Sequence, residues 1–307
     1  MWFLNSYRTN KNKAFQFIVN TALAGDSNNQ QFQLPLVAVS AFNAVVDWGD
    51  GNVDIITSPT QAETLHTYAS AGIYEINITD SLSGWRFDNN GDKDKLINIL
   101  NWGVFQFDVN RAFEQCSLTT ISATDKPFLI TTLNEAFFNC SSLGSFDVSK
   151  WDLSNCVDLR RAFRGCGQNA AGTFTALDVS NWNVSNVIRM DEILQGTDIA
   201  IFDTTSWTTT AMTNMKSAFR QCNDLDYPLD NFDMNGVTDL RDLFRQANGM
   251  STANYDATLI SWANQTLSQN EQTDFGDAEY TLGGLAEASR DTIINTYGWT
   301  ITDGGGV

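Results

Sequence analysis

Residues 177–187 read LDVSNWNVSNV and residues 146–155 read FDVSKWDLSN, so an apolar stretch, an aromatic residue and an Asn/Ser-rich turn recur in the same order. An apolar pair follows each copy, such as Ala162-Phe163 after the earlier one. Six such pairs recur at steps of 24, 26, 31, 25 and 25 residues, and the longest step contains a Gly/Ala-rich insert. A fixed period of this size is typical of repeat proteins. The second members of the pairs are Phe113, Phe137, Phe163, Leu194, Phe219 and Phe244.

Each pair has a further apolar residue four positions before its second member, so the apolar residues fall at i, i+3 and i+4. This spacing predicts one face of a short helix. Short β-like runs precede an aromatic residue twelve positions before the last four pairs, and these aromatics are Trp151, Trp182, Trp207 and Phe232. Each repeat is thus predicted to be a strand, an aromatic turn and a helix, stacked into a solenoid. A regular aromatic ladder in such a stack is expected to form its internal spine, with sugar stacking on exposed rings as the alternative.

The chain before the repeats has short alternating strands between turn residues, from Phe15 to about Gly84. This pattern predicts a small β-sandwich. Within it, residues 45–51 (VVDWGDG) place a tight Asp-Gly turn after an apolar strand, and His66-Thr67-Tyr68 and residues 71–74 (AGIY) precede another strand.

The composition limits the classes of function. The 307 residues contain 36 Asp and Glu against 18 Lys and Arg, so the net charge is -18 and the binding of nucleic acid is disfavoured. The single histidine, His66, disfavours metal sites and imidazole catalysis, and is interpreted as a ring that holds a loop by hydrogen bonds. No stretch approaches the roughly 18 apolar residues of a membrane span, and the chain starts without a secretory signal.

Two groups of oxygen-bearing residues were considered as calcium ligands. Asp47, Asp50 and Asp54 could gather around Ca²⁺, but turn-capping carboxylates explain Asp47 and Asp50 as well, and the turn is the preferred interpretation. Asp88, Asn90 and Asp92 alternate as in a calcium loop. The segment lacks the glycine that such a loop has at its sixth position, and Ile99 stands at the twelfth position, where a calcium loop has an acidic residue. A polar turn is the preferred interpretation, so we expect no cofactor and keep Ca²⁺ only as a weak alternative.

The five cysteines are predicted to be buried thiols rather than disulfide or zinc ligands. Four of them follow an apolar pair by three residues, where Thr197 and Ala247 stand in other repeats, and Cys156 occupies a place that other repeats give to Val or Met. There is no C-x-x-C pair, and an odd number without a framework fits maturation in a reducing compartment. The four repeat cysteines are Cys116, Cys140, Cys166 and Cys222.

Two resemblances follow from these motifs. The recurring LDVSNWNVSNV and AFRGC segments resemble the BspA-type leucine-rich repeats of bacterial and phage surface proteins over about residues 105–250, and the tail resembles that family's closing segment. The WGDG, HTY and AGIY elements resemble a PKD domain. The resemblances imply a β-rich α+β protein: an N-terminal arm at 1–13, an immunoglobulin-like sandwich at 14–84, a connector at 85–104, the repeats at 105–250 and a cap at 251–307.

They also imply a non-enzymatic surface protein. The missing signal points to a phage virion protein on the virion surface, whose basic arm (Arg8 to Lys13) docks onto other virion proteins unless it is merely a frayed terminus. The repeats would then face a host glycan or protein. No insertion into a membrane is expected. Association of several copies of the chain is left open. The alternatives are a secreted adhesin on the bacterial cell surface and, remotely, a polysaccharide-degrading enzyme with two carboxylates.

Overall fold

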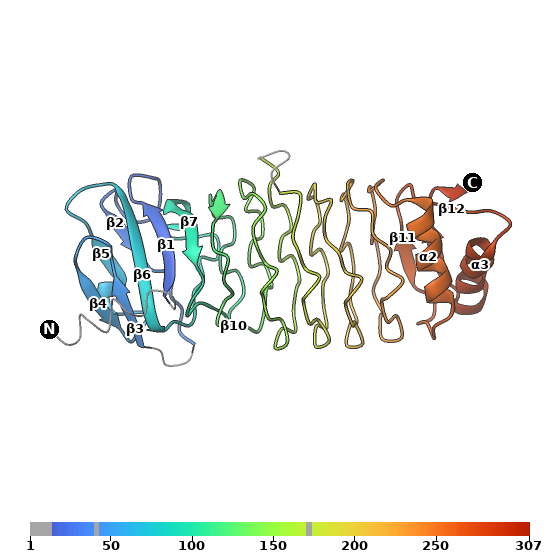
Figure 1. Cartoon of the computed structure of the whole chain (residues 1–307), viewed down its shortest axis with the longest axis horizontal. Helices are drawn as coiled ribbons and strands as arrows, with labels where there is room; N and C mark the ends of the chain where they lie inside the picture. The colour runs from blue at the N-terminus through green and yellow to red at the C-terminus, as the bar shows by residue number, and fades with distance from the viewer. Residues whose placement is uncertain (1–13, 40–42, 170–173) are drawn as a thin grey trace.

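The computed structural model describes residues 14–39, 43–169 and 174–307, so the predicted arm at 1–13 lies outside the described residues. The molecule is elongated, with β-sheet at its N-terminal end, turn-rich layers through the middle and two helices at its C-terminal end (Figure 1). One continuous buried core runs from Phe15 to Trp299. Neither of the two described α-helices has the length and apolarity needed to cross a membrane.

The N-terminal part is built on a six-stranded sheet in the order β4-β3-β6-β1-β7-β9, with β2 and β5 paired separately. Its central strand β1 buries every second side chain, Phe15, Phe17 and Val19, and pairs antiparallel with both β6 and β7. The strands are β1 (Phe15–Asn20), β2 (Gln31–Gln33), β3 (Asn43–Asp47), β4 (Val53–Ile56), β5 (Leu65–Thr67), β6 (Ile73–Ser81), β7 (Leu96–Asn101) and β9 (Thr120–Ile121); 3₁₀ turns cover Ala62–Thr64 and Lys93–Lys95.

The prediction of an immunoglobulin-like, PKD-like sandwich is wrong. The sheet does not end at residue 84, because β7 lies in the expected connector and β9 lies within the expected repeats. β9 pairs with β7 in parallel, as successive layers of a stack do, so the sheet passes into the repeat region without a boundary. The alternation of apolar residues predicted these strands, but it carries no information on which strands pair.

The repeats form layers of turns, and the prediction of a leucine-rich-repeat solenoid with a helix in each repeat is wrong. The protein is mostly β, and the described residues between β10 (Leu129–Ile130) and α2 (Thr252–Ala263) contain turns and isolated bridges but no helix. The apolar spacing i, i+3, i+4 arises instead from two turns around each apolar pair. The backbone is left-handed two residues before and two residues after the second residue of each apolar pair. A right-handed helix cannot continue through such a residue. These positions are Arg111, Glu135, Arg161, Glu192, Ser217 and Asp242, and Gln115, Asn139, Gly165, Gly196, Gln221 and Gln246.

Hydrogen bonds between successive repeats replace those of a helix. Around Phe137, for example, the N–H groups of Glu135, Phe137 and Asn139 donate to Arg160, Ala162 and Arg164 of the next repeat at 2.8–2.9 Å. A six-residue helix would be marginal in water, whereas these bonds form next to a packed core. We call each repeat, folded in this way, a layer.

The C-terminal segment lies across the last layer. The N–H of Phe244 donates to Asp274 in β11, the rings of Phe244 and Phe275 stack at 5.9 Å, and Trp262 of α2 donates its indole N–H to Leu229 at 2.9 Å. Helices α2 and α3 pack on each other, and two parallel strand pairs complete the segment. The elements are α2, β11 (Gln272–Asp274), β12 (Glu279–Tyr280), α3 (Leu285–Tyr297), β13 (Thr300–Thr302) and β14 (Gly305–Gly306).

Candidate functional site

A strip of uncharged side chains runs along the layers on one side. In each layer two outward residues flank a buried one, as Asn155 and Val157 flank Cys156. Val157 is 46% exposed and Ile188 is 45% exposed. We call this surface the uncharged strip, and its residues are Leu129, Thr131, Asn155, Val157, Asn186, Ile188, Ala211, Thr213, Gly236 and Thr238.

Backbone hydrogen bonds hold the strip in register. The N–H of Ile188 donates to Val157 at 2.9 Å, that of Thr213 to Ile188 at 2.9 Å and that of Thr238 to Thr213 at 3.0 Å. One column of the strip carries a β-branched side chain in every layer, and such side chains have few rotamers. The strip is therefore rigid before any partner arrives.

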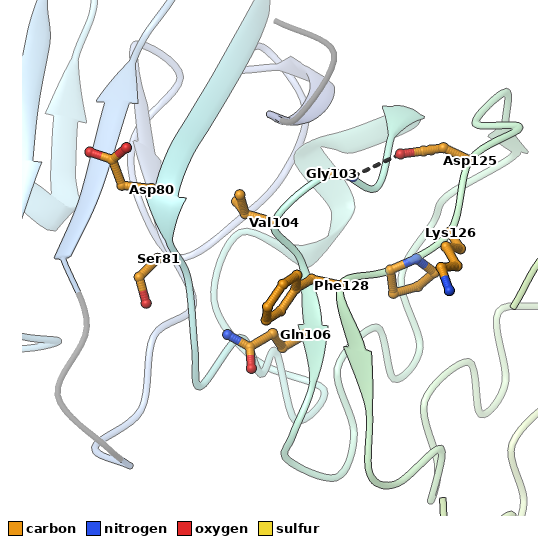
Figure 2. A pocket seen from close by; sticks show the side chains of 9 residues that line it. Asp80, Ser81, Gly103, Val104, Gln106, Asp125, Lys126 and Phe128 are labelled. Atoms are coloured by element: carbon orange, nitrogen blue, oxygen red, sulfur yellow. Dashed lines mark hydrogen bonds between the residues drawn. The ribbon is translucent and has the colours of Figure 1, made fainter. Parts of the chain in front are cut away.

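A pocket of about 710 Å³ lies at the N-terminal end of the strip (Figure 2). Pro127 and Phe128 line it and lead directly into β10, which pairs with β8 (Gln106–Phe107). The Phe128 ring is 72% exposed, although its N–H is fixed to Phe105 at 2.8 Å. The residues that line the pocket are Asp80, Ser81, Gly103, Val104, Gln106, Asp125, Lys126, Pro127 and Phe128.

Some polar side chains of this pocket are held by hydrogen bonds to the backbone, and the carboxylate of Asp80 is not. Asp125 accepts the N–H groups of Trp102 and Gly103 at 2.8 and 2.9 Å, so its carboxylate braces the wall, as Figure 2 shows for Gly103. Gln106 donates its amide N–H to Leu82 at 2.9 Å, which fixes the side chain and leaves its oxygen as an acceptor. The carboxylate of Asp80 has no hydrogen bond or ion pair with any other described residue.

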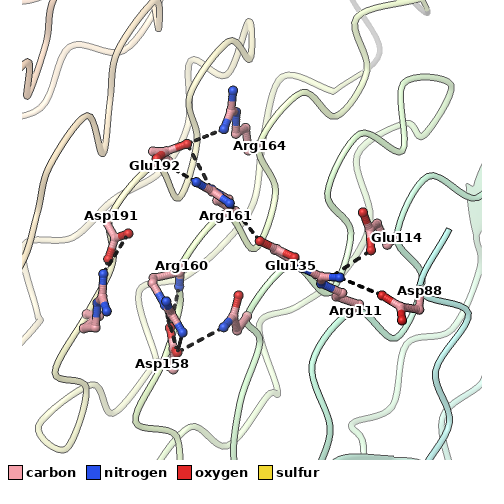
Figure 3. A network of polar contacts seen from close by, with 12 residues as sticks. Asp88, Arg111, Glu114, Glu135, Asp158, Arg160, Arg161, Arg164, Asp191 and Glu192 are labelled. Atoms are coloured by element: carbon pink, nitrogen blue, oxygen red, sulfur yellow. Dashed lines mark hydrogen bonds and ion pairs between the residues drawn. The ribbon is translucent and has the colours of Figure 1, made fainter.

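A ladder of alternating charges follows the left-handed positions from layer to layer (Figure 3). Arg111 pairs with Asp88 at 2.8 Å and with Glu135, and Arg161 pairs with Glu135 at 2.9 Å and with Glu192 at 3.0 Å. The ladder ends where Ser217 takes the next position. The charges of this face are thus neutralised by one another.

Burial raises the pKa values of these acids and the arginines lower them, so the net direction differs from one acid to another. Burial alone would raise the pKa of Glu192, but the hydrogen bond and charge of Arg161 outweigh it, so the pKa lies below its ordinary value. The pKa of Asp88 is lowered in the same way, against burial, by Arg111 and Arg86. Burial raises the pKa of Glu114 despite Arg111.

This ladder predicts loss of stability in acid. A carboxyl group whose pKa is lowered by folding stabilises the protein at neutral pH, and that stabilisation is lost as the pH falls through the folded-state pKa. Glu192→Gln should therefore lower the free energy of unfolding by about 1 kcal/mol at pH 7, and less below about pH 4. Urea unfolding from pH 7 to pH 3 checks this. An equal loss at both ends of the range would show that the charge of Glu192 does not stabilise the fold.

The predicted aromatic ladder lies inside the protein. Trp151, Trp182, Trp207 and Phe232 are at most 3% exposed, and the centroids of neighbouring rings lie 6.2–6.3 Å apart. The second members of the six apolar pairs are buried as well. These residues therefore support the layers and are out of reach of a ligand.

The calcium candidates have other partners. Asp88 pairs with Arg86 and Arg111, Asn90 bonds to the backbone of Asp88, and Asp92 pairs with the buried ammonium of Lys95 at 3.3 Å. Within the described ranges, no three His, Cys, Asp or Glu side chains are arranged to hold a metal ion.

The turn carboxylates of the N-terminal part have structural contacts. Asp47 and Asp50 accept backbone N–H groups two residues on, and Asp54 accepts the indole N–H of Trp48. His66 bonds to Asp50 at 2.9 Å and stacks on Trp48 at 4.6 Å, so it fastens this loop.

All five cysteines are buried and free. Cys140, Cys166 and Cys222 donate their S–H groups to carbonyl groups of the preceding layer at 2.9–3.1 Å. Burial raises the pKa of the Cys140, Cys156 and Cys222 thiols to about 12, so they are poor nucleophiles at neutral pH.

The layered region is also the part of the chain that resembles a known family. Residues 107–198 and 131–257 match the model described as Mycoplasma protein of unknown function, DUF285. The family has no known function. No curated protein and no solved structure matches the chain.

This match corrects the resemblances inferred from the sequence. The matching model is neither a leucine-rich-repeat nor a PKD model, so the assignments to BspA-type leucine-rich repeats and to a PKD domain are not supported. The sequence analysis also missed the uncharged strip and the Phe128 pocket. The recurring triplets, in which a buried residue lies between two uncharged ones, were a signal for the strip; nothing in the sequence indicated the pocket.

Proposed function

We propose that this protein is a non-enzymatic attachment protein, displayed on a virion surface, which binds a host glycan or protein through the uncharged strip. The observation that carries the proposal is the strip itself. In a chain with a net charge of -18, it extends over five layers without a charged side chain. A partner can cover the strip without desolvating charged side chains, and such desolvation would cost binding free energy.

The rigidity of the strip supports the same proposal. Its backbone is fixed by bonds between layers, and its β-branched side chains have little rotamer freedom to lose. Binding costs less when the surface is already ordered. The neighbouring charged residues, such as Asp158 and Arg160 at 2.7 Å, are paired among themselves and would form a polar rim.

An adhesin on a bacterial cell surface is the second candidate. It is favoured by the description of the matching family, which names Mycoplasma, a cellular organism. Immunogold labelling of source material with antibody against this chain distinguishes the two locations. Label on particles supports the virion, label on cell envelopes supports the adhesin, and label confined to the cytoplasm contradicts both.

The strip is tested by a double substitution. Val157→Glu with Ile188→Glu places two charges in its middle and should weaken binding of the labelled protein to intact host cells at least about tenfold. Both side chains are exposed, so the melting temperature should stay within a few degrees of the parent. Flow cytometry and thermal unfolding measure the two effects.

The matched control is Asn181→Glu with Thr208→Glu, which adds the same charge at exposed positions outside the strip. This control should bind cells as the parent does. Equal loss of binding in both variants would indicate general repulsion, and undiminished binding of the Val157/Ile188 variant would remove the strip from the proposal.

A further inference from the structure

We infer that the pocket beside Phe128 binds one neutral sugar ring of a glycan. The inference rests on the proposed function and gives it a substrate class and an anchoring point. The pocket lies directly before the first strip residue, Leu129, so a glycan held there continues onto the strip.

The size and the aromatic wall of the pocket favour this ligand. A volume of about 710 Å³ lies within the range of small-molecule sites and exceeds what a single ion needs. Among the described residues, Phe128 is the phenylalanine that stands with the exposed large hydrophobic side chains, and it is 72% exposed. A sugar presents an apolar face of C–H groups, which packs on such a ring, while Val104 and Pro127 extend the apolar wall.

The polar groups suit hydroxyl groups. The same pocket is lined by Gln106, whose amide oxygen is free to accept, by Ser81, and by Asp80, whose carboxylate has no partner among the described residues. In Figure 2, Gln106 lies next to Phe128, while Ser81 and Asp80 lie on β6 and the carboxylate of Asp80 points away from Phe128. The amide oxygen of Gln106 can accept a hydrogen bond from a hydroxyl at the edge of a ring that stacks on Phe128, and the carboxylate of Asp80 can accept one from a hydroxyl farther from that ring.

Charge restricts the class further. Asp80 and Asp125 both line the pocket, and its one cation, Lys126, lies 3.6 Å from Asp152 in an exposed ion pair. With the net charge of -18, this repels phosphate, sulfate and carboxylate groups. A wholly apolar ligand would exclude water from the carboxylate of Asp80 without offering it a hydrogen-bond donor. A neutral, hydroxyl-rich ring meets both conditions.

The full chain should be tested on an array that carries neutral, sialylated and sulfated glycans. We expect binding to neutral glycans only, and the affinity for the best neutral oligosaccharide is then measured by calorimetry. Phe128→Ala should weaken it about tenfold or more, whereas Phe128→Tyr, which keeps the ring, should retain it. Asp80→Asn should weaken it as well, and asparagine tolerates the left-handed backbone of Asp80, whose φ is 69°.

The control is Ile55→Ala, which removes an apolar side chain that is 59% exposed and lies on the edge strand β4. This variant should bind glycans as the parent does. Unchanged affinity in Phe128→Ala, binding to acidic glycans alone, or release of reducing sugar from the bound glycan would each overturn the inference.

The two proposals can fail separately. If no glycan binds while Val157→Glu with Ile188→Glu still abolishes binding to cells, the sugar site is wrong and the attachment function stands. If glycans bind at Phe128 but the strip variant binds cells normally, the sugar site stands and the strip is not the attachment surface.

Discussion

Trp182→Ala is expected to lower the free energy of unfolding by about 3–5 kcal/mol, without a direct effect on binding. The indole is 3% exposed and lies between Trp151 and Trp207, with ring centroids at 6.3 and 6.2 Å and nearly parallel planes. Its N–H also donates to Val148 of the preceding layer at 3.0 Å. Truncation therefore leaves a cavity inside the stack and removes one of the two hydrogen bonds to the Val148 carbonyl, which keeps the N–H of Trp151 at 3.0 Å.

Urea unfolding at pH 7 measures this effect. Asn181→Ala, at the exposed neighbouring position, should change the free energy by no more than about 0.5 kcal/mol. If Trp182→Ala unfolds like the parent but no longer binds host cells, the aromatic ladder is a binding surface and not a core.

Asp92→Ala is the second substitution with a large expected effect. Asp92 and Lys95 are both fully buried, with Lys95 Nζ 3.3 Å from Asp92 Oδ1 and bonded to three backbone carbonyls of residues 27–31. Asp92 also accepts the N–H groups of Ser27 and Gln33 at 3.0 and 2.7 Å. Removing the carboxylate leaves an uncompensated ammonium in the interior, at a cost of about 3–5 kcal/mol.

Asp94→Ala provides the comparison, because Asp94, two positions after Asp92, is a partly exposed carboxylate that pairs with its neighbour Lys93 at 3.1 Å. Its loss should cost no more than about 1 kcal/mol. Thermal and urea unfolding of both variants at pH 7 would test the difference. Similar, small losses would mean that Lys95 finds water or loses its proton when Asp92 is absent.

Much of the layered region could be predicted from its sequence, because burial follows the repeat. Trp182 and Phe163 were expected in a core by their period, and they lie there. The local backbone could not be predicted in this way. Spacing of i, i+3, i+4 is shared by a short helix and by two successive turns, and only the bonds to the next layer decide between them. Arg111 and Glu135 have left-handed backbone without being glycine or asparagine, so residue type gave no warning.

The candidate site was harder to foresee for a related reason. The alternating spacing of Asp88, Asn90 and Asp92 in the sequence suggested calcium ligands. In the structure Asp88 pairs with Arg111 and Asp92 pairs with Lys95, and the spacing alone does not reveal these contacts. The pocket brings together Asp80 and Phe128 from β6 and from the loop before β10, almost 50 residues apart. A single sequence does not show that two such distant residues line the same pocket.

The alternating charges of Asp88, Arg111, Glu135, Arg161 and Glu192 limit how this protein can change its length during evolution. Loss or duplication of one layer within the ladder would bring two like charges together, for example Arg111 next to Arg161. Loss or gain of two adjacent layers preserves every pairing. Along this half of the stack, a pair of layers is therefore the unit that a gene can add or remove with least disturbance.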